Sequence, residues 1–194
     1  MKIIQLALFI LIVTAIAVQA SSKNNQTDFD LDSNTAFYEG ETHNYIIEPP
    51  HGFVMNTIES RAEGYSFAFV LNGESYDSAS MMIGVHFYRI RGMSFERALT
   101  VDTINLRTFF GAETKIQSVD KTPGGNGQLL VTFSIGDTSV DRAQVLIAYF
   151  DGKTEMIIFD LLVTPKISRS DALKVFLGAV KNFRTLARKE LSKK

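Results

Sequence analysis

The chain has 194 residues, of which 45% are hydrophobic and 21% are charged, and its formal net charge is -1. This composition is typical of a globular protein and excludes a collagen-like, coiled-coil or wholly disordered chain. A near-neutral charge argues against a nucleic-acid-binding protein, which needs a basic surface, and the length suits a single domain.

The first 20 residues have the pattern of a secretory signal peptide. Lys2 supplies a short positive region, residues 3–18 are almost entirely apolar, and Val18 and Ala20 stand at the two positions where signal peptidase requires small residues. We therefore predict cleavage between Ala20 and Ser21 and a secreted or periplasmic protein. Retention of the segment as an uncleaved anchor is the alternative, although its apolar run is shorter than the roughly 20 residues that span a bilayer.

The chain contains no cysteine. Disulfides, c-type haem, iron–sulfur clusters, a thiol nucleophile and a lipoprotein anchor are all excluded. The fold must therefore be stabilised by its hydrophobic core alone.

Beyond the signal peptide, residues 21–36 are polar and acidic, and we predict a flexible leader there. A single domain is expected over residues 37–188, followed by a short basic tail at residues 189–194. No internal repeat and no second domain are evident.

The first half of the domain contains short strands and one helix. Strands are expected where apolar and aromatic residues alternate, at residues 45–47, 53–55, 65–71 and 81–90. Pro49 and Pro50 separate the first two of these strands. Ser94 is the predicted cap of a helix that runs to Phe110 and ends at Gly111.

The second half is predicted to be a meander of four strands and a final helix. The strands are expected at residues 115–122, 128–135, 140–150 and 154–163, with glycine-containing turns between the first two and the last two. Ser168 or Ser170 caps the final helix, which carries an apolar stripe on one face: Ala172, Phe176, Ala179, Phe183 and Leu186. Short hairpin connections make the sheet mainly antiparallel.

Charge is divided unevenly along the chain. Residues 21–80 contain ten acids and two bases, whereas residues 164–194 contain nine bases and two acids. Solvation of the leader and compensation of a helix dipole explain this pattern, and we favour that interpretation. The alternative is a basic C-terminus that contacts anionic lipid or an acidic partner.

A search for catalytic and metal-binding motifs finds little. The three histidines, His43, His51 and His86, have no metal-binding spacing, no Gly-x-Ser-x-Gly motif is present, and the glycines of residues 124–127 lack the lysine of a phosphate-binding loop. We therefore predict no cofactor, no metal and no catalytic residue. His51 follows two prolines in a turn, and His86 lies within a strand where it faces solvent or is satisfied in the core. These two histidines are candidate functional residues, although a lone histidine is more often structural.

Two further groups of side chains could bind a ligand. Asp137 and Asp141 flank a turn, but their spacing does not match a calcium-binding loop. Tyr88 and Tyr149 could line a groove for a peptide or hydrophobic ligand, although core packing is the default for aromatic residues in strands.

Several segments together resemble the PsbP-like domain family, which includes DcrB-like proteins. The resemblance is carried by Tyr45-Ile46-Ile47-Glu48-Pro49-Pro50-x-Gly52-Phe53, by residues 81–90 (MMIGVHFYRI) before the helix that starts Ser94-Phe95-Glu96, and by the closing Asn182-Phe183. It spans roughly residues 42–186. It implies an α/β/α sandwich with a central, mainly antiparallel sheet of about six strands and two main helices. The family's members are mostly accessory or binding proteins, and it offers no shared catalytic motif to transfer.

The leading hypothesis is therefore an exported, non-enzymatic accessory protein that binds a protein or envelope component. A small secreted hydrolase or ligand-processing enzyme is the second hypothesis. It would pair His51 or His86 with a nearby carboxylate in a pocket. The third is a membrane-surface protein that uses the basic C-terminus. The sequence does not give the oligomeric state.

Overall fold

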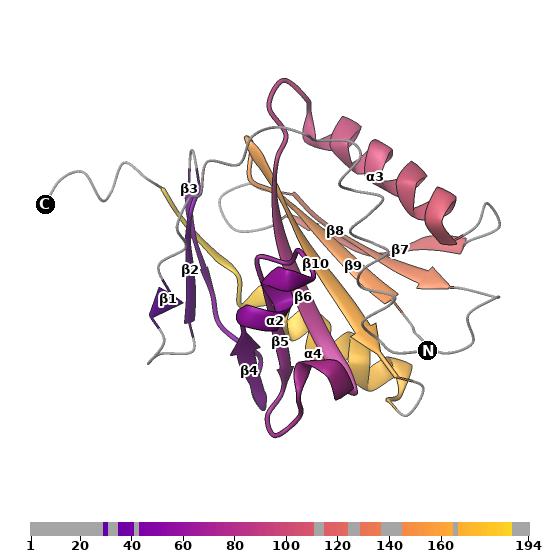
Figure 1. Cartoon of the computed structure of the whole chain (residues 1–194). Coiled ribbons are helices and arrows are strands. Elements are labelled where there is room, and N and C mark those ends of the chain that lie inside the picture. Colours follow the sequence, from indigo (N-terminus) through magenta and orange to yellow (C-terminus); the bar gives the residue numbers. More distant parts are fainter. Residues whose placement is uncertain are drawn as a thin grey trace, which may run out of the picture.

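The structure is a computed structural model, and it describes residues 29–30, 35–40, 43–110, 115–123, 129–136, 145–164 and 167–187. The predicted signal peptide with Ala20 and Ser21, the tail of residues 189–194, and the turn acids Asp137 and Asp141 lie outside these residues. Two sheets and their helices make up the described part (Figure 1).

The main sheet has seven strands in the order β4-β5-β6-β10-β9-β8-β7. Their bounds are Phe53–Asn56 (β4), Phe67–Leu71 (β5), Met81–Arg89 (β6), Lys115–Pro123 (β7), Leu129–Gly136 (β8), Val145–Asp151 (β9) and Glu155–Val163 (β10). Every pair of neighbours is antiparallel, as predicted, and β10 lies at the centre with β6 and β9 beside it. The sheet is one strand wider than the expected six.

Helices cover both faces of this sheet, which confirms the predicted sandwich. Helix α3 (Phe95–Phe110) packs on one face and α4 (Arg169–Lys181) on the other, and each has its own hydrophobic core (Figure 1). Both starts match the sequence, because the Oγ atoms of Ser94 and Ser168 accept hydrogen bonds from backbone N–H groups three residues later, at 3.3 Å and 3.1 Å.

A second, four-stranded sheet has the order β1-β2-β3-β11. Its strands are Phe29–Asp30 (β1), Thr35–Glu39 (β2), His43–Ile47 (β3) and Arg184–Ala187 (β11). Strands therefore already occur within residues 21–36, where a flexible leader was expected. Ala36 explains this difference, because it pairs with Ile47 and is fully buried in the core on the α4 side.

The final helix is shorter than its apolar stripe predicted. It ends at Lys181, and the chain then forms β11, which pairs with β3. Phe183 leaves the helix to pack against Tyr45, Phe150 and Phe159, at ring-centroid distances of 5.5, 4.6 and 5.5 Å. Phe183, which was predicted to lie on the helix, thus packs between the two sheets.

Two short elements were not predicted. They are helix α2 (Ile58–Ala62) and the 3-10 turn η1 (Tyr76–Ser78). Tyr65, which follows α2, and Tyr76 both belong to the core on the α3 side, so these elements border that face of the sheet. In the part of the chain that is described, no helix has the length and apolar character needed to cross a bilayer.

Candidate functional site

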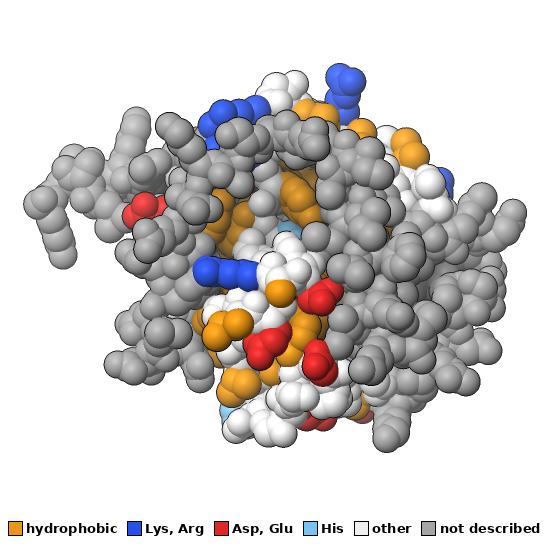
Figure 2. All heavy atoms as spheres, in the orientation of Figure 1, with side chains coloured by type: hydrophobic (Ala, Val, Ile, Leu, Met, Phe, Trp, Pro, Cys, Tyr) orange, Lys and Arg blue, Asp and Glu red, His pale blue; other side chains and the backbone are white. Residues whose placement is uncertain are grey.

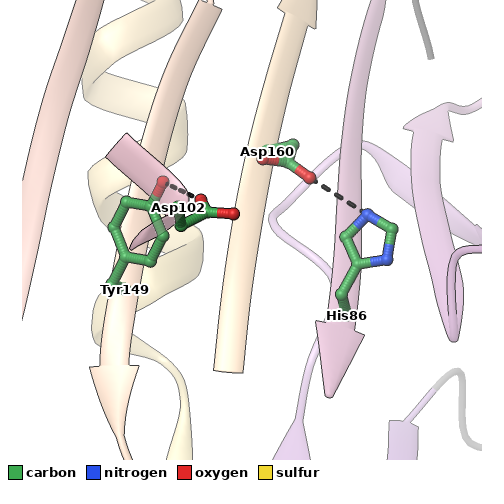
Figure 3. Close-up of polar contacts among 4 residues, drawn as sticks. All are labelled: His86, Asp102, Tyr149 and Asp160. Atoms are coloured by element: carbon green, nitrogen blue, oxygen red, sulfur yellow. Dashed lines mark hydrogen bonds and ion pairs between the residues drawn. The ribbon is translucent and has the colours of Figure 1, made fainter. Parts of the chain in front are cut away.

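Four ionisable side chains meet between α3 and the centre of the main sheet (Figure 3). His86 comes from β6, Asp160 from β10 and Tyr149 from β9, while Asp102 projects from α3. Side chains alternate between the faces of a strand, and these three strand residues share the face that packs against α3. We call these four residues the polar cluster.

The polar cluster is buried. His86 is 4% exposed, Asp160 1% and Asp102 8%, and Tyr149 is fully buried. Burying a charged or polar side chain is costly unless a partner satisfies it. Ionisable side chains that are buried are therefore candidates for a function as well as for a structural role.

His86 and Asp160 form one pair within the cluster. They are diagonal neighbours on adjacent strands, because His86 lies opposite Ile158 and Asp160 lies opposite Gly84. Nε2 of His86 and Oδ2 of Asp160 are 3.1 Å apart. The geometry is nevertheless not that of a hydrogen bond, and this buried carboxylate oxygen has no hydrogen-bond partner. Asp160 thus retains an acceptor inside the protein.

Asp102 and Tyr149 form the second pair. The Tyr149 hydroxyl donates to Oδ2 of Asp102 at 2.5 Å. Burial raises the pKa of Asp102 to about 6; the charge of Asp160 also raises it, while the Tyr149 hydrogen bond and His86 lower it. Burial likewise raises the pKa of Tyr149, followed by the charge of Asp102. The two pairs are therefore coupled electrostatically across β10 and β9.

Aromatic rings surround His86. The Tyr65 ring lies 4.2 Å from the imidazole and the half-buried Tyr88 ring 5.5 Å from it, measured between centroids. Tyr65 itself packs over Gly84, where a Cβ atom would overlap its ring. The buried Tyr65 hydroxyl has no hydrogen-bond partner, and burial raises its pKa.

The structure separates the two histidines chosen from the sequence. His51 is exposed in the turn before β4, whereas His86 is buried beside a carboxylate. His43 lies on β3 in the small sheet, 6.5 Å from the Tyr45 ring. Within the described residues, no three His, Cys, Asp or Glu side chains are grouped so that they could hold a metal ion.

The sequence did not point to Asp102, Asp160 or Tyr65, and it gave Tyr149 only as a residue that could line a groove. One signal was available for Asp160, since it is the single charged residue between Met156 and Val163 in an otherwise apolar strand. No comparable signal exists for Asp102, which sits in an ordinary amphipathic helix. Only the tertiary fold brings it within reach of Tyr149, 47 residues away.

The chemistry open to this arrangement is proton transfer or recognition of positive charge. A histidine beside a carboxylate can accept and donate a proton. Two carboxylates among aromatic rings also form a negatively charged, partly apolar surrounding, which suits a cation.

Comparison with solved structures identifies the architecture. The chain is similar to the PsbP protein of the cyanobacterium Synechocystis sp. PCC 6803 (CyanoP), whose solution structure it matches with a TM-score of 0.50 and 16% sequence identity. The match covers 87% of this chain and 99% of that one. The chain has the PsbP-like fold. No family model and no curated protein matches the sequence.

Proposed function

We propose that this protein is an exported, non-enzymatic accessory protein that binds a partner protein or an envelope component. The PsbP-like fold supports this proposal, as does the signal-peptide pattern of the first 20 residues. The observation that carries it is the burial of His86 and Asp160. This pair brings a histidine within 3.1 Å of a carboxylate, yet it lies inside the core.

Export is tested by the sequence of the mature N-terminus. The secreted protein is expected to begin at Ser21, and an Ala20→Arg variant is expected to accumulate uncleaved, because signal peptidase requires a small residue at that position. Gln19→Arg is the matched control, since the position before Ala20 tolerates large residues, and it should be cleaved normally. Secreted protein that still begins at Met1 would contradict the prediction.

Binding to a partner is tested by cross-linking in the native compartment. The tagged chain is expected to recover the same protein or envelope component in repeated cross-linked preparations, above the background of an unrelated exported protein. Recovery of background alone would count against an accessory role.

A hydrolase is the second candidate, and the 3.1 Å approach of His86 to Asp160 favours it. Such an enzyme would lose turnover of ester, amide or phosphate substrates when His86→Gln or Asp160→Asn is introduced, by the factor of 10²–10⁴ typical of a general base. We expect no turnover that depends on either residue. Turnover lost in both variants would replace the accessory role with the enzymatic one.

A further inference from the structure

The α3 face of the sheet is hollowed beside α2. Figure 2 shows hydrophobic side chains and a histidine side chain at the floor of this hollow. Tyr65 and Tyr76 border the same face, and Val54, Tyr88 and Leu99 are partly buried against its core. A concave, mostly apolar surface with a few polar groups is the usual form of a small-ligand site.

Two buried polar atoms at this face make no hydrogen bond, although one of them, Oδ2 of Asp160, lies 3.1 Å from Nε2 of His86. Oδ2 of Asp160 and the Tyr65 hydroxyl are both buried without a hydrogen bond, and both side chains are at least 98% buried. They belong to the same neighbourhood, because the Tyr65 ring packs on Gly84 and Gly84 lies opposite Asp160 in the sheet. Buried polar atoms that make no hydrogen bond within the protein leave room for a ligand that supplies one.

The charge of the site favours a cation. Asp160 and Asp102 are two carboxylates beside a single imidazole, and the charge of Asp160 raises the pKa of Asp102. A positively charged ligand would counteract that effect. The rings of Tyr65 and Tyr88, both close to His86, add aromatic faces of the kind that attract ammonium groups.

We propose that this hollow binds a small organic cation, an amine or a methylated ammonium group. Asp160 and the Tyr65 hydroxyl would accept its N–H groups or face its charge, and Tyr88 would cover it. A metal ion fits less well, since the described residues offer no group of three ligating side chains. This inference rests on the proposed binding role and names the class of ligand.

The test titrates the secreted chain with choline and, separately, with butylamine, and follows backbone and histidine signals by NMR. The neutral controls have matched shapes: 3,3-dimethylbutan-1-ol for choline and butan-1-ol for butylamine. We expect at least one cation, and neither alcohol, to shift the signals of Gly84, His86 and Tyr88. Asp160→Asn should weaken binding at least about tenfold, whereas Asp77→Asn, an exposed acid on η1, should leave it unchanged.

Three results would overturn the proposal. The first is no shift with either cation up to about 10 mM, a concentration that corresponds to only about -2.7 kcal/mol of binding. The second is an equal response to a cation and its alcohol, and the third is unchanged binding by Asp160→Asn. The first result would mean that an ordered water alone satisfies Asp160 and Tyr65.

Further variants and an independent assay keep these outcomes separable. If Asp160→Asn does not fold, the half-buried Tyr88 provides the second variant, and Tyr88→Leu should weaken cation binding several-fold with little loss of structure. Cross-linking to a macromolecular partner does not depend on the cation. If the titration fails and cross-linking succeeds, only the proposed cation ligand is overturned. If the titration succeeds and cross-linking fails, only the accessory role is overturned.

Discussion

Replacing Asp102 with asparagine should stabilise the folded chain at pH 7 by up to about 3 kcal/mol and leave its stability below about pH 4 nearly unchanged. Folding raises the pKa of this carboxyl from 3.8 to about 6, chiefly because the side chain is buried. Between these pKa values the native state holds a proton that the unfolded chain has released. The contribution of Asp102 to the free energy of unfolding is therefore greatest below pH 4 and falls as the pH rises through 6.

Asparagine does not ionise, and its Oδ1 can still accept the hydrogen bond from the Tyr149 hydroxyl. Urea unfolding of the wild type and Asp102→Asn at several pH values between 4 and 8 measures the effect. Asp77→Asn, which removes an exposed acid, should follow the wild-type curve. An Asp102→Asn variant less stable than wild type at pH 7 would indicate that the ionised carboxylate gains more from His86 and Tyr149 than it loses by burial.

The regular elements could largely be predicted from local sequence. Alternation of apolar residues identified the strands now labelled β5 and β6, a glycine-containing turn preceded the strand now labelled β10, and Ser94 identified the start of α3. These signals are local because the buried face of a strand or helix repeats along its own residues. The order of the elements gave a mainly antiparallel sheet, whereas the sandwich followed from the resemblance to PsbP-like domains, and the similarity to CyanoP confirms it.

The errors arose where distant contacts override local pattern. Phe183 and Leu186 continue the helical spacing of α4, yet hydrogen bonding of β11 to β3 takes the chain out of the helix after Lys181. Such a pairing joins residues about 140 positions apart, and periodicity within the helix contains no information about it. The same kind of contact places residues 35–36 of the expected leader in a strand, because Ala36 pairs with Ile47 of β3 and is buried there.

The candidate site was only partly predictable. His86 was chosen from the sequence, and the structure gives it a carboxylate neighbour that was not identified beforehand. Asp160, Asp102 and Tyr149 lie on three elements separated by loops, so their meeting depends on the order of strands around β10. That order is a property of the whole sheet.

Gly84 provides the second large expected effect. A Cβ atom at this position would overlap the Tyr65 ring. The φ angle of Gly84 is not positive, so its backbone conformation is open to any residue. Gly84→Ala should therefore destabilise the chain by about 3 kcal/mol, the upper end of the range for an overpacked core. Gly178→Ala is the matched control: a Cβ there meets nothing within 4 Å, so the exposed position in α4 should gain about 1 kcal/mol from higher helix propensity.

A double-mutant cycle with Tyr65→Ala tests whether the Tyr65 ring causes the loss of stability in Gly84→Ala, or whether strand β6 accepts no substitution at this position. Tyr65→Ala alone should cost about 4 kcal/mol, because it empties a buried site. With the ring removed, Gly84→Ala should cost almost nothing, so the two effects should fall short of additivity by about 3 kcal/mol. Additive losses would show that the strand backbone requires glycine at position 84, and that overlap with the Tyr65 ring is not the cause of the loss. Since the ring position also holds the Tyr65 hydroxyl near Asp160, Gly84→Ala should weaken binding of choline or butylamine as well, whichever of them binds, whereas Gly178→Ala should not.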